Sequence, residues 1–104
     1  GSVFTVASIA GVMAAKRTHE LIPFCHPLGL TGCNVDLQLN GRVVEISAHC
    51  RVVHKTGVEM EALTAATVAA LTVYDMCTAC SHDIQLRETH LVSKTGGKQD
   101  FHRE

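Results

Sequence analysis

Residues 34–52 read NVDLQLNGRVVEISAHCRV, and apolar and polar residues alternate along both halves of this stretch. Alternation with a period of two is typical of a β-strand that buries one face. The halves meet at Asn40-Gly41, a pair that tolerates positive φ and therefore favours a two-residue hairpin turn. The stretch predicts an antiparallel hairpin covered on one face.

A helix is predicted before the hairpin. Residues 3–20 are rich in Ala, Val and Ile. Pro23 should end this helix, because the residue before a proline avoids the helical region. Residues 24–32 hold a further proline and two glycines and are expected to form an ordered loop.

A second helix is predicted after the hairpin, over residues 57–79. Thr56 and Glu59 have the spacing of a capping box at its start. A last strand is expected over residues 84–93. The order helix, strand, strand, helix, strand predicts an α+β, ferredoxin-like antiparallel sheet with helices packed on one face.

Length and composition limit the class of protein. The 104 residues are sufficient for one domain. A net charge of −1 argues against nucleic-acid and anionic-membrane partners, and no apolar run is long enough to span a bilayer. Five cysteines without a disulfide framework indicate free thiols in a reducing compartment, so a cytoplasmic protein is expected, or one of the mitochondrial matrix if the source is eukaryotic.

The second helix carries three carboxylates: Glu59 and Glu61 in its first turn and Asp75 near its end. No lysine or arginine lies between Lys55 and Arg87, which makes these acids candidates for chemistry. For Glu59, a purely capping role is the alternative. Glu61 and Asp75 are about 21 Å apart along a straight helix, so one substrate could touch both only if it is long or the helix bends. Alternatively, a neighbouring subunit supplies one of them, and a site using both then suggests an oligomer.

Other candidate groups are weaker. His26, in a proline-bounded loop, could titrate near neutral pH, although a surface histidine is the alternative. The basic loops 55–57 and 94–98 could bind phosphate or could be ordinary connections. Cys77, Cys80 and His82 resemble half a zinc site, but no second Cys-x-x-Cys completes it, so no metal ligand is predicted.

Several longer motifs resemble those of the MoaC family, the cyclic pyranopterin monophosphate synthases of molybdenum cofactor biosynthesis. The resemblance covers nearly the whole chain, from about Val3 to Phe101. It rests on AGVMAAKRT (10–18), LIPFCHPL (21–28), KTGVEMEALT (55–64), YDMC (74–77) and KTGGK (94–98).

The resemblance implies a ferredoxin-like subunit in a hexamer, a trimer of dimers, with its pocket at a subunit interface. It implies a lyase that converts 3′,8-cyclo-7,8-dihydro-GTP to cyclic pyranopterin monophosphate and releases pyrophosphate. A radical GTP cyclase would be the pathway partner. No firm cofactor is implied; Mg²⁺ would accompany the triphosphate if any ion does.

The resemblance also implies roles for particular residues. Asp75 and His26 would be catalytic. The substrate-binding residues would be Phe24, Cys25, His26, Glu59, Met60, Glu61 and Lys94.

Two departures from the family pattern stand out. Thr78 occupies the position of a family lysine, and Gly1-Ser2-Val3 matches a motif that a second lysine normally precedes. Residues 1–104 are therefore expected to form a single MoaC-like domain without the family's N-terminal strand and helix. The alternative function is a catalytically impaired or non-catalytic homologue that binds a nucleotide-derived ligand or a sister subunit.

Overall fold

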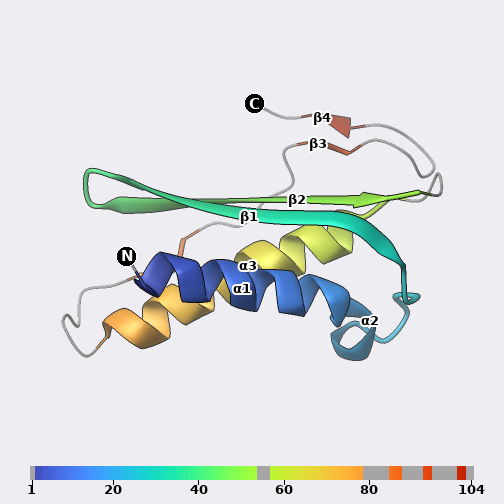
Figure 1. Ribbon diagram of the computed structural model, residues 1–104, viewed down its shortest axis with the longest axis horizontal. Coiled ribbons are helices and arrows are strands. Elements are labelled where there is room, and N and C mark those ends of the chain that lie inside the picture. The colour runs from blue at the N-terminus through green and yellow to red at the C-terminus, as the bar shows by residue number, and fades with distance from the viewer. Residues whose placement is uncertain (1, 54–56, 79–84, 88–92, 95–100, 103–104) are drawn as a thin grey trace.

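The computed structural model describes residues 2–53, 57–78, 85–87, 93–94 and 101–102. The elements in chain order are α1 (Ser2–Lys16), α2 (Thr18–Leu21), β1 (Leu30–Asn40), β2 (Val43–Val52), α3 (Glu59–Cys77), β3 (Ser93–Lys94) and β4 (Phe101–His102). Helices α1 and α3 lie side by side under one face of the β1–β2 hairpin (Figure 1). The predicted α+β, ferredoxin-like arrangement with helices on one face is confirmed.

The hairpin has the predicted strands but a different turn. Asn40 pairs with Val43, so the two turn residues are Gly41 and Arg42 rather than Asn40 and Gly41. Gly41 has φ +64°, and no other described residue has positive φ. Positive φ at the first central position alone is the pattern of a type II′ turn, which favours glycine there. The Asn40 side chain instead donates a hydrogen bond to Glu45, at 3.0 Å.

The alternation of burial along the hairpin matches the prediction. On β2, every second residue from Val44 to Val52 is half-buried, and the residues between them are exposed. Val35 of β1 is buried opposite Ala48. The apolar face of the hairpin therefore points toward α1 and α3.

Several predicted element ends are corrected by the structure. The first helical segment breaks at Arg17 into α1 and α2 and ends before Pro23, as expected. Helix α3 begins at Glu59 with Val58 as its N-cap, so the predicted capping box is wrong: Glu59 is the first helical residue, not the third. The helix ends at Cys77, two residues earlier than predicted.

The loop and last-strand predictions also need correction. Strand β1 begins at Leu30, so the loop predicted over residues 24–32 is shorter. Residues 85–87 are not in a strand, and β3 begins only at Ser93, where it pairs with β4. The other residues of the predicted last strand lie outside the described part of the chain.

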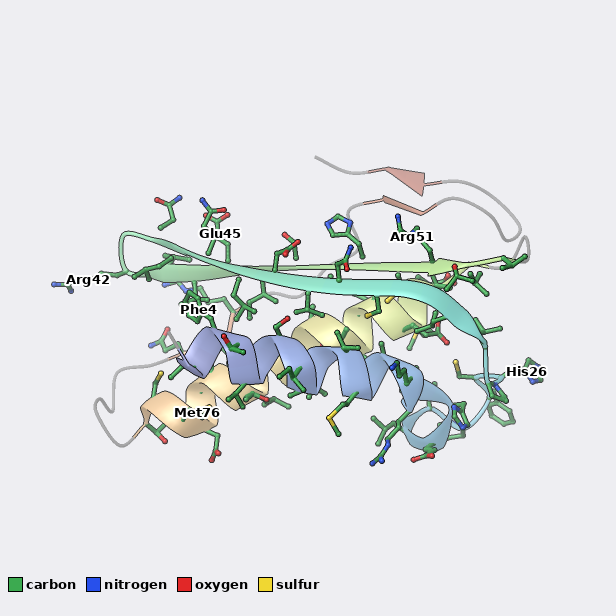
Figure 2. All side chains as sticks on the ribbon, in the orientation of Figure 1. Phe4, His26, Arg42, Glu45, Arg51 and Met76 are labelled. Atoms are coloured by element: carbon green, nitrogen blue, oxygen red, sulfur yellow. The ribbon has the colours of Figure 1, made fainter. Side chains whose placement is uncertain are left out.

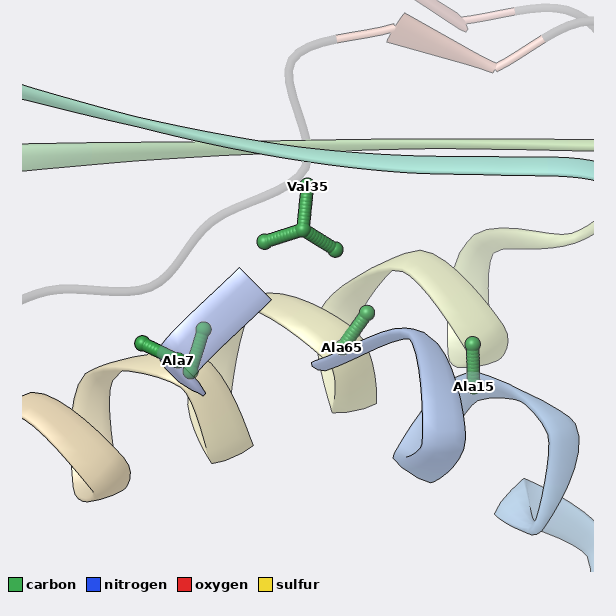
Figure 3. Packing of buried hydrophobic residues seen from close by; sticks show 5 residues of the cluster. Ala7, Ala15, Val35 and Ala65 are labelled. Atoms are coloured by element: carbon green, nitrogen blue, oxygen red, sulfur yellow. The ribbon is translucent and has the colours of Figure 1, made fainter. Parts of the chain in front are cut away.

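The core consists of small side chains. Ala7, Ala15, Val35, Ala65 and Ala69 form its buried cluster (Figure 3). Because alanines project so little, the backbones of α1 and α3 approach each other closely.

Gly11 marks the closest approach of the helices. A Cβ atom at this position would lie 2.9 Å from the carbonyl oxygen of Ala65 and 3.0 Å from a methyl group of Val35. One turn earlier, the Ser8 hydroxyl donates a hydrogen bond to the Val35 carbonyl at 2.8 Å and ties α1 to β1. Gly11 thus lies where both helices and the sheet meet.

We expect Gly11→Ala to lower the free energy of unfolding by about 1 kcal/mol. The gain in helix propensity is about 1 kcal/mol, but overpacking a tight core costs about 1–3 kcal/mol, and the backbone oxygen of Ala65 cannot rotate away. Urea denaturation followed by circular dichroism measures the change. Gly29→Ala is the control, because nothing lies within 4 Å of a Cβ there. An unchanged or higher midpoint for Gly11→Ala would contradict the packing argument.

Candidate active site

A tight turn after α2 presents the first group of candidate residues. The Cys25 backbone N–H donates to the Ile22 carbonyl at 3.1 Å. Pro23 occupies the second position of this turn, where its fixed φ is favoured. The turn leaves the Phe24 side chain 96% exposed and brings the Cys25 thiol toward α3.

The first turn of α3 presents the second group. Glu61 is only 3% exposed, which is unusual for a carboxylate. Its Oε2 accepts a hydrogen bond from the Cys25 Sγ at 3.5 Å. The N-terminus of a helix also favours negative charge in its first turn. A buried acid held between a helix N-terminus and a thiol is a strong candidate for a functional group.

These two groups meet at one pocket with a volume of about 420 Å³. Six of the residues predicted from the sequence line it: Phe24, Cys25, His26, Glu59, Met60 and Glu61. They come from segments more than 30 residues apart in the chain. The fold thus joins the two predicted substrate-binding motifs in a single concave site, of the size that small ligands occupy.

Three further lining residues, Ile22, Leu28 and Gly57, were not among the predicted substrate-binding residues. All three lie inside the motifs 21–28 and 55–64, and Gly57 also belongs to the basic loop 55–57, so these motifs were the signal that could have indicated them. Ile22 and Leu28 add apolar surface to the side of the pocket formed by the turn. Among the residues that the structure describes, the lining includes two carboxylates and no lysine or arginine.

The pocket keeps the Cys25 sulfur protonated. Burial raises the pKa of this thiol, and the negative charge of Glu61, its hydrogen bond and the charge of Glu59 raise it further. A thiol is a much weaker nucleophile than a thiolate. Cys25 is therefore a hydrogen-bond donor here rather than an activated nucleophile.

Asp75 is not at this pocket. It is exposed in the last turn of α3, whereas Glu61 is in the first turn of the same helix. Figure 2 shows the two ends through their labelled neighbours, with Met76 and His26 at opposite ends of the molecule. The separation predicted from sequence spacing is confirmed, because α3 is one continuous helix.

Thr78 closes α3 at its C-terminus. Its backbone N–H donates to the Tyr74 carbonyl at 3.0 Å, and its hydroxyl donates to the Asp75 carbonyl at 3.1 Å. The residue in the position of the family lysine therefore has a capping role beside Asp75 in this chain.

Several predicted groups lie outside the described residues or side chains. Lys94 is in β3, but its side chain is not described, and the basic loops 55–56 and 95–98 are likewise undescribed. Cys80 and His82, two of the three residues that resemble half a zinc site, also lie outside the described residues. Within the described residues, no group of three or more His, Cys, Asp or Glu could hold a metal ion, and no helix is long and apolar enough to cross a membrane.

We expect Glu61→Gln to speed alkylation of Cys25 by iodoacetamide at pH 8. Glu61 raises the pKa of the Cys25 thiol through its charge and its hydrogen bond, so removing the charge should lower that pKa and increase the reactive thiolate fraction, and with it the rate, severalfold. Mass spectrometry of Cys25 over time measures the rate.

Glu45→Gln is the matched control, since Glu45 lies at the hairpin end far from His26 (Figure 2). It should leave the rate unchanged. If Glu61→Gln left the rate equal or slower, the thiol–carboxylate coupling would be wrong.

The chain is similar to known proteins over most of its length. A model of the MoaC family matches residues 1–97. The cyclic pyranopterin monophosphate synthase of Xanthomonas campestris pv. campestris (strain B100) is 58% identical over 102 residues, which are 97% of this chain and 62% of that protein. Molybdenum cofactor biosynthesis protein 1 of Drosophila melanogaster is 57% identical over an alignment of 106 positions, which covers 100% of this chain and 19% of that protein.

The chain spans less than two thirds of the length of the bacterial relatives that it matches. The matched region includes both segments that line the pocket. This chain belongs to the MoaC family.

Proposed function

We propose that this chain acts in molybdenum cofactor biosynthesis as a lyase, a cyclic pyranopterin monophosphate synthase subunit. Its substrate would be 3′,8-cyclo-7,8-dihydro-GTP, supplied by a radical GTP cyclase, and its second product pyrophosphate. The observation that carries the proposal is the pocket itself, where six predicted substrate-binding residues meet. Similarity to the cyclic pyranopterin monophosphate synthase of Xanthomonas campestris supports the same reaction.

The charges of the pocket suggest which part of the substrate it holds. Glu59 and Glu61 are hydrogen-bond acceptors when ionised, and they would repel a triphosphate. A guanine-type base offers N–H donors, including its 2-amino group. We therefore place the base-derived ring against Glu61, with Cys25 and Met60 beside it. The triphosphate would extend out of the pocket toward cations that the described lining lacks.

Two sources of positive charge fit that direction. Lys94 is the proposed phosphate ligand of this chain, and Mg²⁺ would accompany the triphosphate if an ion takes part. His26, exposed at the pocket, would transfer protons during ring opening and reclosure. Closing the cyclic phosphate requires attack of a sugar-derived hydroxyl on the α-phosphorus with pyrophosphate leaving, and cations would stabilise the departing charge.

We further propose that the active form is an oligomer, a hexamer built as a trimer of dimers. Large apolar side chains are exposed on α1, where Val6 is 42%, Ile9 55% and Met13 51% exposed. Their spacing places them along one face of the helix. An apolar face of this kind on a small subunit is typical of a subunit interface.

An oligomer would also explain Asp75. Because Asp75 and Glu61 lie about 21 Å apart on one helix, Asp75 would act in the pocket of a neighbouring subunit. The free thiols of Cys25, Cys33, Cys50 and Cys77 fit a reducing compartment, and we place the protein in the cytoplasm, or in the mitochondrial matrix of a eukaryote.

The direct test is turnover. We expect the chain, incubated with enzymatically prepared 3′,8-cyclo-7,8-dihydro-GTP, to release pyranopterin and pyrophosphate, both detected by mass spectrometry. Thr78→Lys is run beside it, because a lysine would add a cation next to Asp75. Substrate binding without product from the unmodified chain would instead identify a non-catalytic homologue, and absence of binding would reject the substrate.

A binding cycle tests the place of the base. We expect GTP to bind about tenfold or more tightly than its inosine analogue, which lacks the 2-amino donor, since a hydrogen bond to a charged group contributes about 1.5–3 kcal/mol. In Glu61→Gln this preference should largely disappear, whereas Glu45→Gln should retain it. Titration calorimetry gives the dissociation constants. An equal preference in wild type and Glu61→Gln would place the base elsewhere.

A mixing experiment tests the shared site. Glu61→Gln and Asp75→Asn should each be nearly inactive alone. If each site combines Glu61 of one subunit with Asp75 of the other, a reassembled equal mixture of the two variants should recover roughly a quarter of wild-type activity, since half of random dimers are mixed and one of their two sites is intact. A mixture as inactive as its components would show that no site is shared.

A further inference from the structure

Two cysteines behind the pocket face each other across the hairpin. Cys33 of β1 and Cys50 of β2 are direct partners in the antiparallel register. The Cys50 thiol donates a hydrogen bond to the Cys33 sulfur, with the two sulfur atoms 3.6 Å apart. Both are free and half-buried on the face of the hairpin that α1 and α3 cover. Neither residue has a role in the proposed reaction.

The backbone geometry of this pair suits a covalent bond. Directly opposed residues of an antiparallel pair have Cα atoms about 4.5–5.5 Å apart. A disulfide requires a Cα separation of about 4.4–6.8 Å. The sulfur atoms can therefore reach bonding distance by side-chain rotation, without a shift of either strand.

The surroundings assign different roles to the two thiols. Burial raises the pKa of Cys50 to about 12, helped by its hydrogen bond to Cys33, by Cys33's charge and by the charge of Glu61. Because the Cys50 thiol donates its hydrogen bond to the Cys33 sulfur, Cys33 is the more nucleophilic of the two and reacts first with an oxidant. Half-burial also favours the adjacent thiol over bulky external thiols as the next reactant, because the partner is already in place.

We propose that Cys33 and Cys50 form an oxidation site, which hydrogen peroxide converts into a cross-strand disulfide. One peroxide oxygen transfers to the Cys33 sulfur, forming a sulfenic acid and releasing one water. The Cys50 sulfur then attacks that sulfur, so the S–S bond forms as the S–O bond breaks. The departing hydroxyl takes the Cys50 proton and leaves as a second water. Two thiols are oxidised and one peroxide is reduced.

The site adjoins the pocket through Glu61. The carboxylate that accepts the hydrogen bond from Cys25 also contributes to the raised pKa of Cys50. A disulfide here would fix β1 to β2 directly behind that carboxylate. The proposal rests on the register and the sulfur contact, so it stands or falls independently of the proposed enzymatic activity.

Peptide mapping tests the proposal on the intact chain. The protein is treated with hydrogen peroxide, its remaining thiols are blocked with N-ethylmaleimide, and trypsin then cleaves after Arg42, between the two cysteines. We expect residues 18–42, carrying N-ethylmaleimide on Cys25, to be linked to residues 43–51, with a mass lower by two hydrogens than the sum of that labelled peptide and the unlabelled peptide 43–51. Dithiothreitol should separate them.

Two variants identify the bonded cysteine, because residues 18–42 also contain Cys25. The link should persist in Cys25→Ser and disappear in Cys33→Ser. Fragment ions of the linked wild-type peptides locate the bond without depending on the folding of any variant. Full N-ethylmaleimide labelling of Cys33 and Cys50 after oxidation would overturn the proposal. So would a link that survives in Cys33→Ser.

Discussion

The contact of Gly11 with the Ala65 carbonyl and the Val35 side chain is the constraint on which the rest of the structure depends. It sets how closely α1 and α3 approach each other and how near both lie to the hairpin. The position of α3 then determines where its first turn lies. Glu61 belongs to that turn. Its position in the pocket therefore depends on how the core alanines of α1 and α3 pack against each other.

Glu61 connects this packing to chemistry. Burying a carboxylate is costly unless hydrogen bonds and favourable dipoles compensate. Here the helix N-terminus and the Cys25 thiol do so. The described lining of the pocket is therefore acidic and ready to accept hydrogen bonds, and none of its described side chains is a lysine or arginine that could neutralise phosphates. That imbalance is the main reason to consider the subunit as one part of a larger site.

The small core has a second consequence. Filling the interior with alanines leaves many larger apolar side chains at the surface, among them Ile9, Met13 and Phe24. A monomer would gain little from that distribution, whereas an oligomer buries it. Cys33 and Cys50 pack against this core from the covered face of the hairpin, and their sulfur atoms are in contact.

The sequence by itself determined the two long helices, the hairpin with its covered face and the residues of both pocket motifs, because these depend on local periodicity and on short motifs. It did not determine the last strand, since residues 85–87 are not in a strand. It misjudged the turn by one residue and the start of α3 by two, since cap and turn geometry depend on how the chain enters each element. Only the tertiary structure decided that the motif around Cys25 meets the first turn of α3 and that Glu61 is buried there. Those facts follow from helix packing and strand register, which join residues distant in the sequence.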